Sequence, residues 1–132
     1  MLTYLYIALG GGLGSVARYA VSGAVARGVS EVFPWGTLTA NVSGCFIIGL
    51  FAMLTGPDGR VLVPPDFRQF FMVGFCGGYT TFSSFSLQTL VLARDGDMRR
   101  ATANVVASVL FCMIGVWLGT GAGAALNPVG SR

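Results

Sequence analysis

Four apolar stretches occupy almost the whole chain, and their length constrains the fold more than any other feature. They run approximately over residues 2–26, 34–55, 67–93 and 98–126. A helix that crosses the hydrocarbon core of a bilayer needs about 20 mostly apolar residues, and each stretch meets this requirement. The chain has 132 residues, 54% of them hydrophobic, so no segment remains for a soluble domain. We therefore predict an all-α membrane protein in which residues 1–132 form one domain of four transmembrane helices.

Charged residues lie almost entirely between these stretches. All five acidic residues and seven of the eight arginines fall in or beside the predicted connections. No stretch contains the carboxylate that proton-driven export needs, and the chain has no histidine, no paired carboxylates and no nucleophile with an adjacent base. We therefore expect no enzyme. The arginines form no basic face, so we expect no nucleic-acid partner.

The three cysteines, Cys45, Cys76 and Cys112, each lie within an apolar stretch and show no metal-ligand spacing. We interpret them as small free thiols that fill contacts between helices.

The arginines do not select one membrane orientation. Four spans place both termini on one side, with three arginines there and four on the other: Arg60, Arg68 and Arg132, against Arg27, Arg94, Arg99 and Arg100. The positive-inside rule acts through an excess of arginine and lysine on the cytoplasmic side. Either so small a count is uninformative, or copies insert in both orientations and pair antiparallel, and the sequence leaves both open.

Glycines recur at helical spacing in the first and fourth stretches. Gly10 and Gly14 share one helix face, as do Gly115, Gly119 and Gly123. Such seams allow backbones to approach closely, so we read them as packing surfaces, and we take two seams in so small a chain to indicate assembly of several copies.

The third stretch contains a weak point for a helix. Gly77-Gly78 and Thr80-Thr81 fall where a membrane helix should be most apolar. We predict a break near the membrane midplane, where any freed backbone must be satisfied by protein, water or an ion. Carbonyl groups at such a break bind cations and amide groups bind anions.

Aromatic and hydroxyl side chains follow this weak point. Phe82 and Phe85 are three positions apart and share one helix face, with Ser84 beside them. The edges of phenyl rings are positive, so two rings presented edge-on are able to contact a small anion.

Two further polar residues lie within the stretches. Asn41 is the deepest amide donor of the second stretch, and its alternative role is a hydrogen bond between helices worth about 1 kcal/mol. Arg18 is the one charged residue that lies well inside a stretch, away from its ends. It either faces a water-filled vestibule that attracts anions, or snorkels to the membrane edge in a structural role.

Taken together, three motifs closely resemble the Fluc fluoride channels, also called CrcB proteins. They are the glycines and Arg-Tyr pair at 11–19, Gly-Thr-x-x-x-Asn-x-x-Gly at 36–44, and Gly-Phe-Cys-Gly-Gly-Tyr-Thr-Thr-Phe-Ser-Ser-Phe at 74–85. The resemblance spans three of the four predicted helices, and the third motif is highly specific.

The resemblance implies a passive, fluoride-selective channel that exports cytoplasmic fluoride and reduces its toxicity. Its implied form is a multi-pass protein of the cell (inner) membrane, built as an antiparallel dual-topology homodimer with two pores. The implied partners are fluoride, a second copy and the lipid bilayer.

The resemblance also assigns roles to individual residues. A sodium ion at the dimer interface would be held by backbone carbonyls of Gly77 and Thr80 from both subunits, with no organic cofactor. Asn104 departs from the family pattern, which has a tyrosine one turn before the serine, but it also supplies a donor. The implied pore comprises the rings Phe82 and Phe85, the amides Asn41 and Asn104, the hydroxyls Thr81, Ser84 and Ser108, and Arg18 in the vestibule.

Two other functions remain open from the residues alone. A gradient-coupled transporter of another small solute would show saturable, ion-dependent uptake. A structural membrane subunit would use its glycines and hydroxyls only for helix packing.

Overall fold

The computed structural model describes residues 1–29 and 32–127, and all regular secondary structure in that part of the chain is helical. Glu31 and Arg132, which entered the charge counts, lie outside the described residues. In chain order the elements are α1 (Leu2–Gly28), α2 (Trp35–Leu54), α3 (Pro65–Gln69), the π-helical segment η1 (Phe70–Cys76), α4 (Gly77–Tyr79), α5 (Phe82–Arg94) and α6 (Met98–Leu126).

The four apolar stretches are helical over nearly the ranges expected from the sequence. Among the described residues, two helices, α2 and α6, are long and apolar enough to cross a membrane. α1 is longer than α2, but its tyrosines, glycines and Arg18 lower its mean hydropathy. The third stretch is divided at residues 80 and 81, so neither of its parts has that length.

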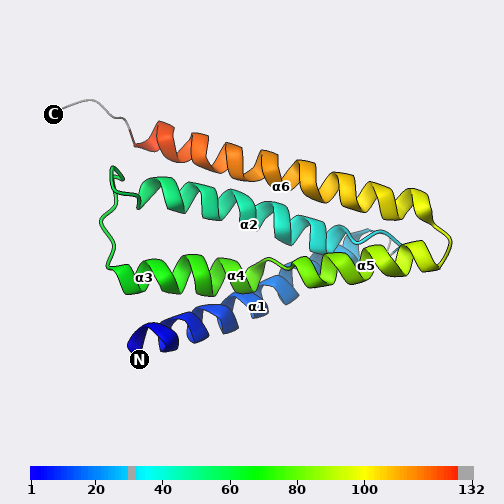
Figure 1. Ribbon diagram of the computed structural model, residues 1–132, viewed down its shortest axis with the longest axis horizontal. Coiled ribbons are helices and arrows are strands. Elements are labelled where there is room, and N and C mark those ends of the chain that lie inside the picture. The colour runs from blue at the N-terminus through cyan, green and yellow to red at the C-terminus, as the bar shows by residue number, and fades with distance from the viewer. Residues whose placement is uncertain (30–31, 128–132) are drawn as a thin grey trace.

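The helices form an elongated bundle (Figure 1). α2 lies between α6 and a column formed by α3, η1, α4 and α5, while α1 crosses this column obliquely (Figure 1). α1 packs on η1 and α4, and α2 packs along α6. α1 begins and α6 ends at the same end of the bundle.

Glycines make the closest helix contacts. A Cβ at Gly119 would lie 3.0 Å from the backbone nitrogen of Leu50 and against the carbonyl oxygen of Phe46, so α6 can approach α2 only without a side chain there. A Cβ at Gly10 would lie 2.9 Å from the nitrogen of Phe75. Both seams are therefore packing surfaces, as predicted, but they pack within one chain and give no support to assembly of several copies.

Aromatic rings join α2 to the column. Phe71, Phe75 and Tyr79 are four positions apart, and successive ring centroids lie 5.5 and 6.0 Å apart. Phe51 of α2 lies 4.3 Å from Phe71. This row places Tyr79 at the end of α4, where it is 6% exposed.

The connection between α5 and α6 is a tight turn. Gly96 has φ +82°, which glycine adopts without steric cost. The Asp97 carboxylate then caps α6 by accepting a hydrogen bond of 3.0 Å from the backbone N–H of Arg100. This hydrogen bond lowers the pKa of Asp97, and the Arg100 guanidinium at 2.6 Å acts in the same direction.

We predict that Gly119→Ala destabilises the protein by about 1–3 kcal/mol, because the added methyl group overpacks the contact with α2. Gly121→Ala is the matched control: a Cβ there meets nothing within 4 Å, and both changes gain the same helix propensity. Denaturant unfolding of the purified protein in detergent measures both. Equal stability of the two variants would contradict the close contact.

Candidate functional site

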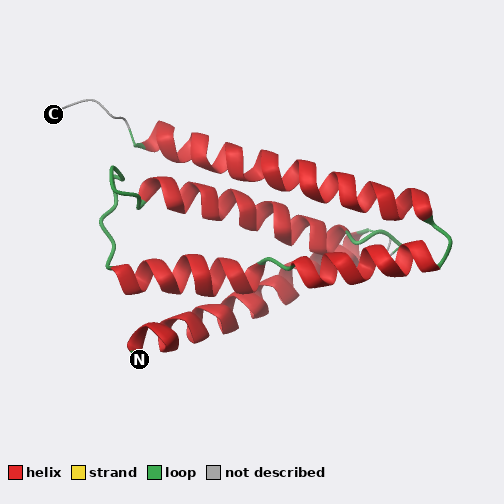
Figure 2. Ribbon diagram, viewed as in Figure 1, coloured by secondary structure: helices red, strands yellow, loops and turns green. Residues whose placement is uncertain are grey.

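The column is interrupted at two threonines. α4 ends at Tyr79 and α5 begins at Phe82, and a short loop separates the two helices in Figure 2. Thr80 has φ −87° and ψ 159°, and Thr81 has φ −153° and ψ 116°, so both are extended. The carbonyl end of one helix therefore meets the amide end of the next, and these ends carry partial charges of opposite sign.

Asn41 fills the gap that this interruption leaves in the backbone hydrogen bonds. Its Oδ1 accepts a hydrogen bond of 2.7 Å from the N–H of Thr81, and its Nδ2 donates one of 3.0 Å to the carbonyl oxygen of the same residue. In an unbroken helix the Thr81 N–H would instead bond to the carbonyl of Gly77. Asn41 is 9% exposed, so it satisfies both groups away from solvent.

Thr81 also begins α5. Its Oγ1 accepts a hydrogen bond of 3.1 Å from the N–H of Ser84 and donates one of 3.1 Å to the Ser84 hydroxyl. The Ser83 hydroxyl lies 3.2 Å from the same oxygen. Hydroxyls from three residues thus gather at the amide end of α5, where an anion is favoured.

On the other side of the interruption, Arg18 contacts the carbonyl end of α4. Its Nε donates a hydrogen bond of 3.2 Å to the carbonyl oxygen of Gly78. A cation at the C-terminal end of a helix is stabilising. The structure therefore gives Arg18 a definite contact with the interruption from α1.

The two phenylalanines lie on the first turn of α5. Their ring centroids are 5.2 Å apart and the ring planes are tilted by 52°. Phe85 is buried, whereas Phe82 is 78% exposed within the single chain. A phenyl ring this exposed next to a polar interruption needs a further surface against it, either lipid or protein.

Asn104 and Ser108 of α6 belong to a chain of hydrogen bonds that ends at Phe85. The Ser108 hydroxyl donates to Oδ1 of Asn104 at 3.4 Å, and Nδ2 of Asn104 donates to the Thr89 hydroxyl at 2.8 Å. Thr89 in turn donates to the carbonyl oxygen of Phe85 at 2.8 Å. Thr89 was not among the residues predicted from the sequence, although it lies one turn after Phe85 on the same helix face.

A groove of about 390 Å³ opens beside the interruption. Asn41, Thr80, Thr81 and Phe82 line it together with Gly77, and within the described chain all of its lining residues are uncharged. Ser84 and Phe85 follow one turn along α5, whereas Ser108 and Asn104 lie outside this lining. The groove thus offers amide, hydroxyl and aromatic groups without a fixed charge.

A cation site built from backbone oxygens requires residues whose backbone borders an accessible groove, and Gly77 and Thr80 both do so. Both line the groove, Gly77 is exposed, and a Cβ there would meet only the Met72 carbonyl at 4.0 Å. The N–H of Thr81 is directed to Asn41 instead of the Gly77 carbonyl. Carbonyl oxygens of this kind suit a hard cation.

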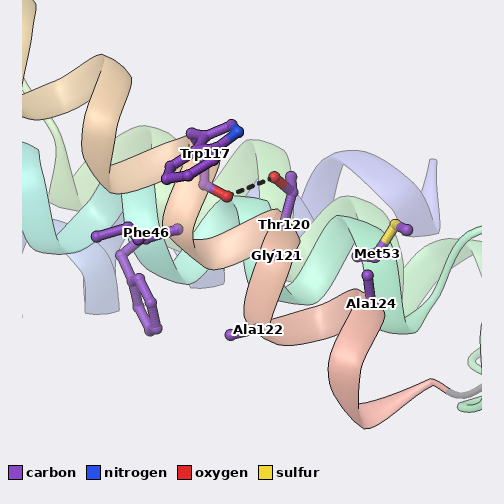
Figure 3. A pocket seen from close by; sticks show the side chains of 8 residues that line it. Phe46, Met53, Trp117, Thr120, Gly121, Ala122 and Ala124 are labelled. Atoms are coloured by element: carbon purple, nitrogen blue, oxygen red, sulfur yellow. Dashed lines mark hydrogen bonds between the residues drawn. The ribbon is translucent and has the colours of Figure 1, made fainter.

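A second groove, of about 650 Å³, lies between α2 and α6 (Figure 3). Phe46, Met53 and Trp117 line it with small residues of α6. Its one hydroxyl, that of Thr120, donates to the carbonyl oxygen of Trp117 at 2.8 Å. This surface is apolar and offers no set of donors to an ion.

The bundle and the uncharged groove define an all-helical protein, within the described residues, with a polar interruption in its third helical stretch. Residues 5–120 match the family model described as CrcB-like protein, Camphor Resistance (CrcB). The chain belongs to this family.

Three relatives all have the name fluoride-specific ion channel FluC. The one from Rhodospirillum rubrum is 65% identical over 118 residues, which are 89% of this chain and 92% of the relative. The one from Opitutus terrae is 61% identical over 129 residues, 98% of both chains. The one from Paramagnetospirillum magneticum is 56% identical over 127 residues, 96% of this chain and 99% of the relative.

We predict that Asn41→Ala speeds amide hydrogen exchange at residues 80–84, because it leaves both backbone groups of Thr81 unpaired at a cost of about 1–3 kcal/mol each. Exchange measured by mass spectrometry on the purified protein tests this. Thr39→Ala, an exposed position on the same helix, should leave exchange there unchanged. Unaltered exchange in the Asn41 variant would show that its side chain does not hold the interruption.

Proposed function

We propose that this chain forms a passive, fluoride-selective channel that releases cytoplasmic fluoride and so reduces its toxicity. The observation that supports it most is the 65% identity to a fluoride-specific ion channel along 89% of the chain. The uncharged donors around the interruption are what the physical chemistry of such a channel requires.

Fluoride is small and tightly hydrated, so its path must replace water with other donors. Asn41, Thr81 and Ser84 supply amide and hydroxyl groups near the interruption. The rings of Phe82 and Phe85 supply positive edges. The path must also avoid a single site of very tight binding, because an ion held too tightly does not leave. Neutral groups meet both conditions. The charged side chain of Arg18 lies on the other side of the interruption, where it bonds to the carbonyl oxygen of Gly78.

The working form that we propose is an antiparallel, dual-topology homodimer with two pores, in which four helices of each copy cross the cell (inner) membrane. The exposed ring of Phe82 would then lie against the second copy. The interruption at residues 80 and 81 divides the third stretch into nearly equal parts, which fits a position near the membrane midplane. The near-equal arginine counts fit insertion in both orientations.

We further propose that backbone carbonyls of Gly77 and Thr80 hold a structural sodium ion between the two copies. One chain offers two such oxygens beside the groove, so a complete oxygen shell requires the second copy. When bound, the ion would supply positive charge to the converging carbonyl ends of the helices. At the carbonyl end of α4, Arg18 already donates a hydrogen bond to the carbonyl oxygen of Gly78.

We predict that Phe82→Ile and Phe85→Ile each reduce fluoride efflux from proteoliposomes by about tenfold, because losing about 1.4 kcal/mol of contact to the passing ion changes a rate by that factor. A fluoride electrode measures the efflux. Phe111→Ile is the control, since this ring lies on α6 outside the groove and is 50% exposed. Undiminished flux in both variants would remove the rings from the mechanism.

The same assay separates the channel from a gradient-coupled transporter. Fluoride flux set by its own gradient, without proton or sodium coupling and far faster than chloride, is the expected result. Saturable uptake driven by another ion would favour the transporter, and equal chloride flux would contradict fluoride selectivity.

We predict that an external protease cleaves an N-terminal tag on about half of the copies in sealed inside-out vesicles, because nearly balanced arginines favour neither orientation. Two added arginines in the turn at 95–97 should move the cleaved fraction well away from half. Complete cleavage or complete protection of the unmodified chain would contradict dual topology.

A further inference from the structure

Three cysteines from separate helical segments line the groove beside the interruption. Cys45 lies on α2, Cys76 at the end of η1 and Cys112 on α6. All three are free thiols. The proposed function gives none of them a role, so their convergence on one groove calls for its own explanation.

Two of these cysteines lie near each other across the contact between α2 and α6. The Cβ of Cys45 lies 3.6 Å from where a Cβ at Gly115 would stand, so the two helices are close at this level. Cys112 precedes Gly115 by three positions and shares its helix face. Cys112 therefore lies near Cys45, and both residues line the same groove. Cys76 does not complete a three-ligand cluster with them in the described part of the chain.

We propose that Cys45 and Cys112 form a two-thiol binding site for a soft divalent cation that takes two ligands in line, with mercury(II) as the cation that fits. Thiolates select soft metals. Zinc requires four ligands, and calcium or magnesium requires oxygen. Two thiols alone therefore exclude the common biological divalent cations.

Electrostatics selects the charge of the cation. The lining residues of the groove are uncharged within the described chain, and burying a net charge in such surroundings is costly. Silver(I) or copper(I) bound by two thiolates would leave one negative charge, whereas mercury(II) bound by two thiolates is neutral. Each thiol loses its proton to water, two mercury–sulfur bonds replace the two mercury–chlorine bonds of mercuric chloride, two chloride ions leave, and no electron is transferred.

A metal bound at this position should affect ion passage, an inference that rests on the proposed function. The groove that Cys45 and Cys112 line also contains Asn41, Thr81 and Phe82. A metal that joins α2 to α6 at this level stands beside the donors of the proposed path. Mercury bound there should therefore stop fluoride flux.

The first test measures retained metal on the full-length protein. Wild type, Cys45→Ser, Cys112→Ser and Cys76→Ser are exposed to mercuric chloride, washed with a single-thiol scavenger, and analysed for mercury per chain. Wild type and the Cys76 variant should each keep one mercury, and the other two should lose it, because one thiol cannot chelate. Equal retention by all four proteins, or loss in the Cys76 variant alone, would overturn the site. Alanine replaces serine at either position if the serine variant does not fold.

The second test repeats the flux assay after mercuric chloride treatment. Efflux should stop in wild type and in Cys76→Ser, and continue in Cys45→Ser and Cys112→Ser. Full efflux from wild type that retains mercury would overturn the placement of the site on the path. Absent efflux before treatment would instead refute the channel itself, and the metal content would still decide whether the site exists.

Discussion

The hydrogen bonds between the Asn41 amide and the backbone of Thr81 hold the arrangement on which the rest of the site depends. Two extended residues inside an apolar bundle would leave peptide groups without partners, at a cost of several kcal/mol in lipid. One side chain supplies both an acceptor at 2.7 Å and a donor at 3.0 Å. The interruption persists because α2 satisfies it from outside the column. That pairing keeps the carbonyl end of α4 apart from the amide end of α5, with the groove beside them.

Close packing of the helices makes this pairing possible. Gly44 lies one turn after Asn41, and a Cβ there would lie 3.0 Å from the Tyr79 ring and against the side chain of Thr80. The hydroxyls of Ser43 and Tyr79 are 2.9 Å apart and fix the ring that ends α4. A chain with few large buried side chains thus obtains its order from glycine contacts and polar pairs, as expected where lipid weakens the hydrophobic drive between helices.

The helices were predictable because apolar length alone determines them, and their ranges agree closely with the structure. The weak point at Gly77-Gly78 and Thr80-Thr81 was visible because glycine and threonine disfavour a helix interior. The partners across the interruption were not predictable from spacing, because Asn41 and Thr81 are 40 positions apart and Arg18 and Gly78 are 60 apart. The glycine seams were read correctly as packing surfaces, yet spacing could not show that both pack within one chain.

The row of hydrogen bonds from Ser108 to Phe85 has a fixed direction. A carbonyl oxygen only accepts, so the Thr89 proton points to Phe85 and the Thr89 oxygen receives the Asn104 amide. The Asn104 oxygen is then turned toward Ser108, and the 3.4 Å bond between them is the longest of the three. The proton of the Ser108 hydroxyl is therefore the one most easily redirected. Rotation of the Ser108 hydroxyl alone would redirect this proton and leave the hydrogen bonds of Asn104 and Thr89 in place.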